Sequence, residues 1–173
     1  IDPHVVEVET VTGVTRRVHG EFIVIATGSR PRTPADVPVD HDHVLDSDSI
    51  LSMIYLPQSL SVLGSGVIAC EYASIFAALG VKVVMIDRAD TPLKFLDPEL
   101  SGRFTKAFQR MGGRFMGGQH AKKVEWDGVQ SVVTTLESGL ELRTDKLLCC
   151  LGRVANIDGL DVEAAGLAAN ARG

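Results

Sequence analysis

The sequence predicts an α/β fold in which a parallel sheet is combined with helices and a three-stranded antiparallel meander. Short apolar runs, typical of strands buried on both faces, alternate with two segments of helical period between residues 59 and 113. After residue 114 the hydrophobic period shifts towards two, and glycine-containing turns divide the chain into short strands. The first pattern predicts strand–helix–strand units, and the second predicts the meander.

The first part of the chain is predicted to contain two strands and a loop. Residues 5–9 and 21–26 have strand composition, with a turn at Thr12-Gly13 between them. The second of these runs is apolar almost throughout, which indicates a strand buried on both faces. Three of the seven prolines fall between positions 31 and 38, so this segment is predicted to be a loop and a domain boundary.

Three helices are predicted from capping residues and apolar spacing. The run Asp46-Ser47-Asp48-Ser49 provides N-cap groups for a short helix through Met53. A second helix follows Gly66 and ends before Gly80, with an apolar stripe of Ile68, Tyr72, Ile75, Phe76 and Leu79. A third begins at Asp97-Pro98 and ends at Gly112-Gly113, with a stripe of Leu100, Phe104, Ala107, Phe108 and Met111.

The remaining apolar runs are predicted to be strands. Residues 61–63 and 81–87 flank the second helix, and residues 146–151 form a last buried strand that ends at Gly152. The predicted meander strands are 121–126, 129–136 and 140–143, with turns at Asp127-Gly128 and Ser138-Gly139.

Composition excludes several classes of protein. The chain has 173 residues, of which 45% are hydrophobic and 23% charged, as in a globular protein. Its net charge is −5 with no basic run, which argues against a nucleic acid partner, and no apolar stretch reaches the roughly 20 residues that span a bilayer. The three cysteines, two of them adjacent, predict no disulfide framework and favour a reducing, cytoplasmic location. The start at Ile1 is expected to be the middle of a longer chain.

A glycine-rich turn is the clearest functional motif. Gly64-x-Gly66-x-x-Ala69 follows a predicted strand and opens a predicted helix. In a dinucleotide-binding fold, the first glycine allows a tight turn and the second lets backbone N–H groups approach a pyrophosphate at the helix N-terminus. Asp87 lies 87 − 64 = 23 residues after the first glycine, close to the spacing of about 20 residues expected for the acid that binds the ribose. The alternative is an ordinary strand–helix turn that happens to be rich in glycine. The pattern favours dinucleotide binding.

Other polar residues allow two interpretations each. Glu71 lies at the border of the predicted apolar stripe, where it is either a surface side chain or a functional acid. Arg88 is either a solvated charge or a partner for the 2′-phosphate of NADP. The run His41-Asp42-His43 has no further metal ligands nearby in the sequence, so we interpret it as a solvated loop and predict no metal site.

Three segments together resemble the flavoprotein disulfide reductase superfamily. Residues 24–31 (VIATGSRP), 64–71 (GSGVIACE) and 151–156 (LGRVAN) are similar to that family's ATGSxP, GxGxxGxE and GRxPN blocks, in the same order. The second block departs from the pattern at Ala69, and the third at Ala155 in place of proline. The resemblance implies a Rossmann-like FAD/NAD(P)-binding fold.

The resemblance also implies roles for matching residues. Gly64, Ser65, Gly66 and the amides of Val67 and Ile68 would line the pyrophosphate of NAD or NADP. Glu71 and Gly152 would lie near the nicotinamide, with Glu71 the candidate catalytic residue. Asp87, with Arg88 beside it, would meet the adenine-side ribose, and Thr27 and Gly28 would approach FAD.

Within the superfamily, the likeness is greatest to the soluble pyridine nucleotide transhydrogenases, with dihydrolipoamide dehydrogenases next. Residues 46–53, 70–76 and 95–97 carry it. It implies FAD-domain strands and a linker at 1–45, an NAD(P)-binding domain at 46–153 and a return segment at 154–173. The expected activity is hydride transfer between NADPH and NAD+ through FAD, in a full-length homodimer joined by a C-terminal domain missing here. This chain alone is expected to be inactive. A disulfide reductase fragment and a non-catalytic NAD-binding module remain the alternatives.

Overall fold

The computed structural model describes residues 3–170, which divide into two compact units. The larger unit is formed by residues 31–152, and the smaller one by the described residues before and after it. The chain therefore leaves the smaller unit once, builds the larger unit, and returns.

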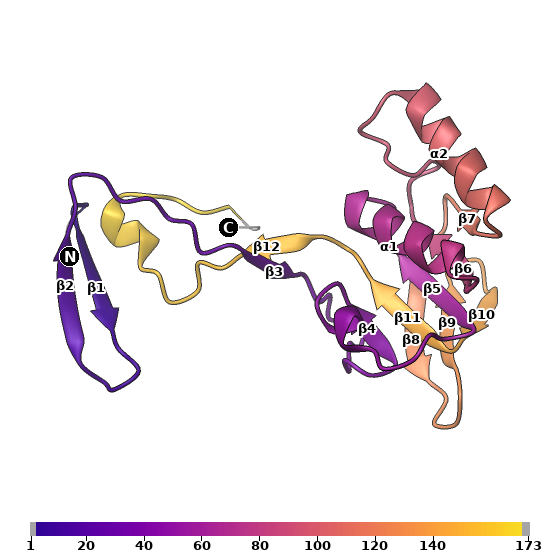
Figure 1. The fold of residues 1–173 in the computed structure, drawn as a ribbon, viewed down its shortest axis with the longest axis horizontal. Coiled ribbons are helices and arrows are strands. Elements are labelled where there is room, and N and C mark those ends of the chain that lie inside the picture. The colour runs from indigo at the N-terminus through magenta and orange to yellow at the C-terminus, as the bar shows by residue number, and fades with distance from the viewer. Residues whose placement is uncertain (1–2, 171–173) are drawn as a thin grey trace. The chain divides into compact units, whose positions relative to one another are not determined.

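The larger unit is organised around a five-stranded parallel sheet (Figure 1). Its strand order is β4 (Val44–Asp46), β11 (Lys146–Cys149), β5 (Ser59–Leu63), β6 (Lys82–Ile86) and β7 (Arg114–Met116). Helix α1 (Val67–Ala78) connects β5 to β6, and α2 (Pro98–Arg110) connects β6 to β7. An antiparallel sheet of β8 (Ala121–Trp126), β9 (Val132–Leu136) and β10 (Glu141–Thr144) then leads into β11. The predicted α/β fold with a three-stranded meander is confirmed.

Alternating side chains of the parallel strands separate two hydrophobic clusters. On β6, Val83 and Met85 belong to the cluster that contains α1 and Phe108 of α2, whereas Ile86 belongs to the cluster that contains the meander. The strands β4, β5 and β11 divide their residues between the two clusters in the same way. Because side chains alternate along a strand, one sheet supports helices on one face and the meander on the other.

Helix α1 packs through a small-residue face, which differs from the predicted stripe. Its buried residues are Ala69, Cys70, Ala73, Phe76 and Ala77. Ile75 and Leu79, predicted to be in the stripe, are 51% and 57% exposed, so that part of the prediction is wrong. Three alanines spaced by four residues let the helix backbone approach the sheet closely, and Ile75 and Leu79 lie outside this contact.

Helix α2 begins as predicted, with the Asp97 carboxylate accepting a hydrogen bond from the Glu99 N–H at 2.8 Å and Pro98 at the first helical position. Only part of its predicted stripe is buried. Phe108 is fully buried, but Leu100 is 54% exposed. The next residue, Ser101, is buried instead of Leu100.

Several strands differ from the predicted ones. Residues 114–116 form β7, an edge strand paired with β6 that was not predicted. The strand predicted at 21–26 is absent: this segment has no regular structure, and Phe22 is 86% exposed. Within the described residues no strand pairs with it, and an apolar run needs a paired neighbour to become a strand. The predicted strand at 121–126 is confirmed as β8, whereas β4 was not predicted.

The helix predicted after residue 46 is a single 3-10 turn, η1 (Ser49–Ser52), and its N-cap residue Asp48 makes no side-chain cap. Asp46, two residues before Asp48, provides the capping side chain instead. Its carboxylate accepts hydrogen bonds from the backbone N–H groups of Asp48 (3.0 Å) and Ser49 (2.7 Å) and from the Ser49 hydroxyl (2.9 Å). Burial alone would raise the pKa of Asp46, but these donations outweigh it and lower the pKa.

Gly64, directly after β5, has no room for a side chain. A β-carbon there would lie 2.5 Å from the carbonyl oxygen of Cys150, and its φ of +109° is in the region that disfavours other residues. Gly66, two residues on, is different, because a β-carbon there would meet nothing within 4 Å. Glycine is therefore required at position 64 by the close backbone contact, whereas glycine at position 66 leaves open space at the N-terminus of α1.

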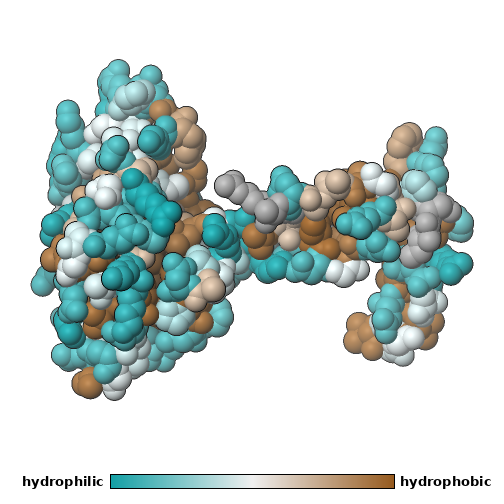
Figure 2. Space-filling view, turned by 180° about the vertical axis from the view of Figure 1, so that it is seen from behind, coloured by the Kyte–Doolittle hydropathy of each residue, from teal (hydrophilic) through white to brown (hydrophobic). Residues whose placement is uncertain are grey.

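The smaller unit contains two short two-stranded sheets. The hairpin strands β1 (Val5–Glu9) and β2 (Thr15–His19) pair through the turn predicted at Thr12-Gly13. Strand β3 (Ser29–Pro31) pairs with β12 (Arg153–Ala155), and a 3-10 turn, η2 (Val162–Ala165), follows. Figure 2 shows hydrophobic patches on the surface of this unit. Phe22 and Val24 are among its exposed hydrophobic residues.

Replacing Asp46 with alanine is expected to lower the free energy of unfolding by about 1–2 kcal/mol at pH 7, because two backbone donors lose their partner. The folded-state pKa of Asp46 is lowered, so its stabilisation is present above the unfolded pKa and is lost as pH falls through the folded value. Urea unfolding at pH 7 and pH 3 should therefore show a smaller difference from wild type at the lower pH. Glu141→Ala, at an exposed position of β10, is the control. Equal losses for both variants at pH 7 would contradict the role of Asp46.

Gly64→Ala is expected to destabilise the protein by roughly 2–4 kcal/mol, because the new methyl group clashes with a backbone carbonyl at a positive φ. Gly66→Ala is the matched control and should cost about 1 kcal/mol or less. Thermal unfolding followed by circular dichroism compares the two. Similar melting temperatures for both variants would show that the Cys150 carbonyl does not restrict Gly64.

Candidate functional site

The turn between β5 and α1 lies at the carboxyl edge of the parallel sheet and is bonded to its neighbours on both sides. The Gly64 N–H donates to the carbonyl of Ile86 at the end of β6 (2.9 Å). The Cys150 N–H, just past β11, donates to the carbonyl of Leu63 (2.9 Å), and the Ser65 carbonyl accepts from Leu93 (2.8 Å). In open α/β sheets, ligands bind outside this edge.

The first turn of α1 presents unbonded amide groups at that edge. Gly66 is the N-cap, and the first helical hydrogen bond runs from the Cys70 N–H to its carbonyl (3.0 Å). The N–H groups of Val67 and Ile68 therefore have no carbonyl within the helix, and the first turn contains no acidic side chain. With the open space at Gly66, this helix end can accept an anionic group on its backbone donors.

A cleft of about 270 Å³ opens at the ends of β5 and β6 in the larger unit. Its lining combines apolar side chains with charged groups of both signs: Arg32, Pro34, Asp36, Val37, Leu63, Ile86, Asp87, Arg88, Gln119, His120, Ala121 and Leu151. Of the predicted site residues, Asp87 and Arg88 lie in this lining. The glycine turn and the N-terminus of α1 are not part of it.

Asp87 is held in place by its own backbone. Its N–H donates to the Met116 carbonyl (3.2 Å), and its carbonyl accepts from the Gln119 N–H (2.9 Å). Carboxylate oxygen Oδ1 accepts from the Ala89 N–H at 2.7 Å. A carboxylate offers about four lone pairs, so this fixed group keeps the capacity to accept hydrogen bonds from hydroxyl groups in the cleft.

Arg88 is exposed, and its guanidinium contacts a histidine from another segment. Its Nη2 lies 2.6 Å from Nε2 of His120, and Nδ1 of His120 lies 3.1 Å from a carboxylate oxygen of Glu137. Sequence reasoning missed His120 and Glu137. Nothing local marks them, because only the packing of the meander beside β6 brings them to Arg88.

The cysteines near this edge are free thiols with weak reactivity. Burial, together with the negative charge of Asp87, raises the pKa of Cys70 to about 12, and burial raises the pKa of Cys150 to about 12 as well. The Cys70 Sγ donates to the Ser65 carbonyl at 3.4 Å. A protonated, buried thiol is a poor nucleophile and a poor metal ligand, so these cysteines are structural.

The other predicted residues lie elsewhere. Glu71 is exposed on α1 outside the cleft lining. Gly152, with φ +109°, follows Leu151 of the cleft, and its carbonyl accepts from the Arg32 N–H (2.9 Å). Thr27 and Gly28 belong to the smaller unit, where Asn156 bonds to both: its N–H donates to the Gly28 carbonyl (3.0 Å) and its side-chain amide to the Thr27 carbonyl (3.1 Å).

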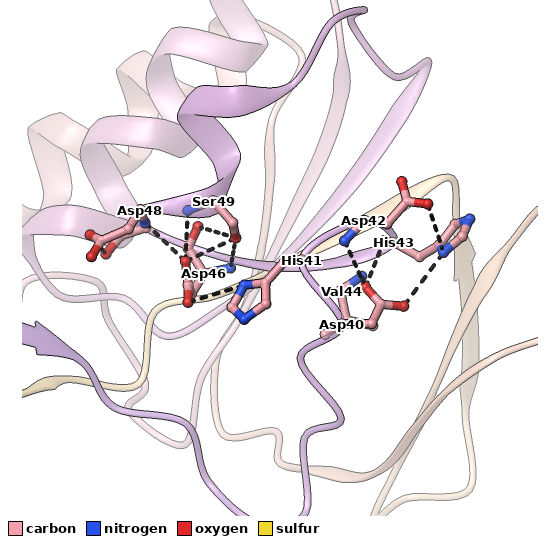
Figure 3. Close-up of polar contacts among 9 residues, drawn as sticks. Asp40, His41, Asp42, His43, Val44, Asp46, Asp48 and Ser49 are labelled. Carbon is pink, nitrogen blue, oxygen red and sulfur yellow. Dashed lines mark hydrogen bonds and ion pairs between the residues drawn. The ribbon is translucent and has the colours of Figure 1, made fainter.

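In the segment before β4, His41 and His43 each lie close to an aspartate carboxylate (Figure 3). His41 lies 3.6 Å from the Asp46 carboxylate and His43 lies 3.4 Å from that of Asp40, while the His43 ring stacks on Trp126. Asp40 accepts three backbone N–H bonds of 2.7 to 2.9 Å, which lower its pKa although burial alone would raise it. No group of three or more potential metal ligands is found among residues 3–170. No helix in that range is long and apolar enough to cross a membrane.

Comparison with known proteins agrees with this geometry. The chain is 43% identical over 173 residues to the soluble pyridine nucleotide transhydrogenase of Ectopseudomonas mendocina and 41% identical over 174 residues to that of Pseudomonas aeruginosa. Each match covers 99–100% of this chain but only 37% of the relative. It therefore spans little more than a third of their length.

Solved structures give the same picture. The HOCl-induced flavoprotein disulfide reductase RclA from Escherichia coli, as its Cu(II) complex, matches with a TM-score of 0.87 and 30% identity, over 100% of this chain and 39% of RclA. LpdA from Mycobacterium tuberculosis matches with a TM-score of 0.87 and 25% identity, over 96% of this chain and 36% of LpdA. The family model for pyridine nucleotide-disulphide oxidoreductases matches residues 1–173. This chain therefore belongs to the pyridine nucleotide-disulphide oxidoreductase family.

Proposed function

We propose that this chain is the NAD(P)(H)-binding domain of an FAD-dependent transhydrogenase that moves hydride between NADPH and NAD+. One observation carries the proposal: a glycine turn, the open amides of α1 and the Asp87 carboxylate lie at one edge of one parallel sheet. A dinucleotide needs donors for its pyrophosphate and acceptors for a ribose about one strand away, and this edge offers both.

Each residue at the edge has a distinct part in binding. Gly64 closes the turn, and Ser65 holds the following loop through its carbonyl. Gly66 leaves space for the pyrophosphate, which Val67 and Ile68 bind through their N–H groups. Asp87 accepts hydrogen bonds from the adenosine ribose hydroxyls, and Arg88 lies beside it for a 2′-phosphate.

The nicotinamide end is assigned to Glu71 and Gly152. Glu71 follows the first turn of α1 on an exposed face, open to a bound ring or to a neighbouring flavin domain. Gly152 has a positive φ and, as glycine, keeps the backbone beside the cleft free of a side chain. Both would orient the nicotinamide, without themselves taking up the hydride.

FAD, when bound to the whole protein, would supply the hydride chemistry. Thr27 and Gly28 are the residues of this chain assigned to its side, and the hydrogen bonds to Asn156 give that segment a defined backbone to present. NADPH and NAD+ would use the nucleotide site in turn. The whole protein is proposed to be a cytoplasmic homodimer.

A disulfide reductase of the dihydrolipoamide dehydrogenase type is one alternative, and the likeness to the flavoprotein disulfide reductase RclA favours a disulfide reductase. A non-catalytic NAD-binding module is the other alternative. Assays of the full-length protein separate them. Reduction of a second nicotinamide nucleotide by NADPH, without turnover of a disulfide substrate, supports transhydrogenation. Disulfide turnover, or a redox-active cysteine pair elsewhere in the reading frame, would overturn it. Nucleotide binding with neither activity would support the non-catalytic module.

Gly66→Val should abolish NAD(H) binding while the fold survives. The free protein has open space for the branched side chain, but that space is where the pyrophosphate reaches the amides. Gly102→Val is the control, since Gly102 of α2 also has open space and lies far from this edge in sequence. Calorimetric titration with NADH measures binding, and circular dichroism checks folding. Unchanged affinity of the Gly66 variant would refute the proposed pyrophosphate site.

Wild-type protein should bind NAD(H) more tightly than NADP(H), by less than about a hundredfold. Asp87 faces the place of the 2′-phosphate, and two like charges at contact range cost roughly 1–4 kcal/mol near a surface. Arg88 offsets part of that cost. Asp87→Asn should narrow the difference and Arg88→Ala should widen it, as measured by titrating both cofactors. A wild-type preference for NADP(H), or no effect of Arg88→Ala, would contradict this ribose pocket.

A further inference from the structure

We propose that His120, positioned by Glu137, is a specificity-determining residue that makes the choice between NADP(H) and NAD(H) depend on pH. The inference rests on the proposed nucleotide function of the cleft. It is carried by the chain of contacts from Arg88 to His120 to Glu137, which begins beside Asp87 inside the cleft lining.

The contacts determine where the His120 ring carries its proton. Arginine has only donors, so Nε2 of His120, 2.6 Å from Arg88 Nη2, accepts a hydrogen bond and carries no proton. The proton of the neutral ring is then on Nδ1, which donates to the Glu137 carboxylate at 3.1 Å. Both contacts are satisfied together when the ring carries a single proton on Nδ1, and Glu137 selects that tautomer.

Three separate segments build this arrangement. Arg88 follows β6, His120 precedes β8, and Glu137 follows β9. The Glu137 N–H also donates to the His120 carbonyl (2.9 Å), and the Ser138 hydroxyl donates to the Gln119 side chain (3.2 Å). His120 is therefore held by backbone as well as side-chain bonds, and its side chain is 29% exposed.

A proton on His120 would change the cleft in two ways. The ring would become a donor at both nitrogens, so Nε2 could no longer accept from Arg88. Arg88 would be released from this bond, and a second cation would face the same cleft. NADP differs from NAD by a phosphate at the adenosine ribose. The added positive charge on His120 and the released Arg88 would attract this phosphate, so protonation of His120 favours NADP(H) selectively.

Charged groups line the cleft together with His120: Arg32 and Asp36 from the proline-rich segment, and Asp87 after β6. In sequence, Asp90 belongs to the same loop after β6, and Lys122 is on β8, two residues from His120. Histidine is the side chain type whose unperturbed charge change falls between pH 5 and 8, which makes His120 the proposed origin of the pH response.

The test is the ratio of the NADH to the NADPH dissociation constant, measured by calorimetry at pH 6 and pH 8. In wild type the ratio should rise as pH falls, by roughly three- to tenfold more than in His120→Gln, whose amide still accepts from Arg88 but does not titrate. The 2′-phosphate also titrates near pH 6, but it contributes equally to both proteins. His19→Gln, at an exposed position of β2, is the matched control and should behave as wild type.

Glu137→Gln should weaken the pH response, because the protonated ring loses its counter-charge while the position of Nδ1 can still be held by a hydrogen bond. A response in His120→Gln equal to that of wild type would overturn the inference, although both nucleotides still bind. Failure of wild type to bind either nucleotide at both pH values would instead overturn the proposed function.

Discussion

The close approach of Gly64 to the Cys150 carbonyl is the constraint on which the candidate site depends. Since no side chain fits between them, β5 can turn sharply into α1 while the end of β11 passes directly beside it. The hydrogen bonds of Gly64 and Ser65 to neighbouring segments then fix the direction in which α1 begins. Where the helix points its free amides is thus decided by a contact between two backbones.

The rest of the larger unit supports that edge from both faces. The alanines of α1 bring the helix close to the sheet, and the meander covers the other face through residues such as Leu136 and Val132. The meander has a second consequence, since it delivers His120 and Glu137 to the end of β6. Packing and candidate chemistry are therefore connected: the sheet that closes the core also completes the polar lining of the cleft.

The sequence predicted what depends on local chemistry. The positions of Gly64, Gly66 and Asp87 at a turn, a helix start and a strand end could be predicted because all three belong to one strand–helix–strand unit, which local sequence patterns mark. The buried face of α1 could not be predicted, because the helical period does not show whether Ile75 or the smaller Ala77 packs against the sheet. The strand at 21–26 failed for lack of a paired neighbour among the described residues, and His120 was missed because its partners are distant in sequence.

The larger unit is inserted within the smaller one, and this has a consequence for assembly. Strands β3 and β12 are neighbours in one sheet, yet the chain between them runs from residue 32 to residue 152. Closing so long a loop in an unfolded chain is entropically unfavourable. Once the insertion has folded, the Arg32 N–H and the Gly152 carbonyl lie 2.9 Å apart, and the loop is in effect already closed. The inserted unit therefore acts as a template that brings the two halves of its host together.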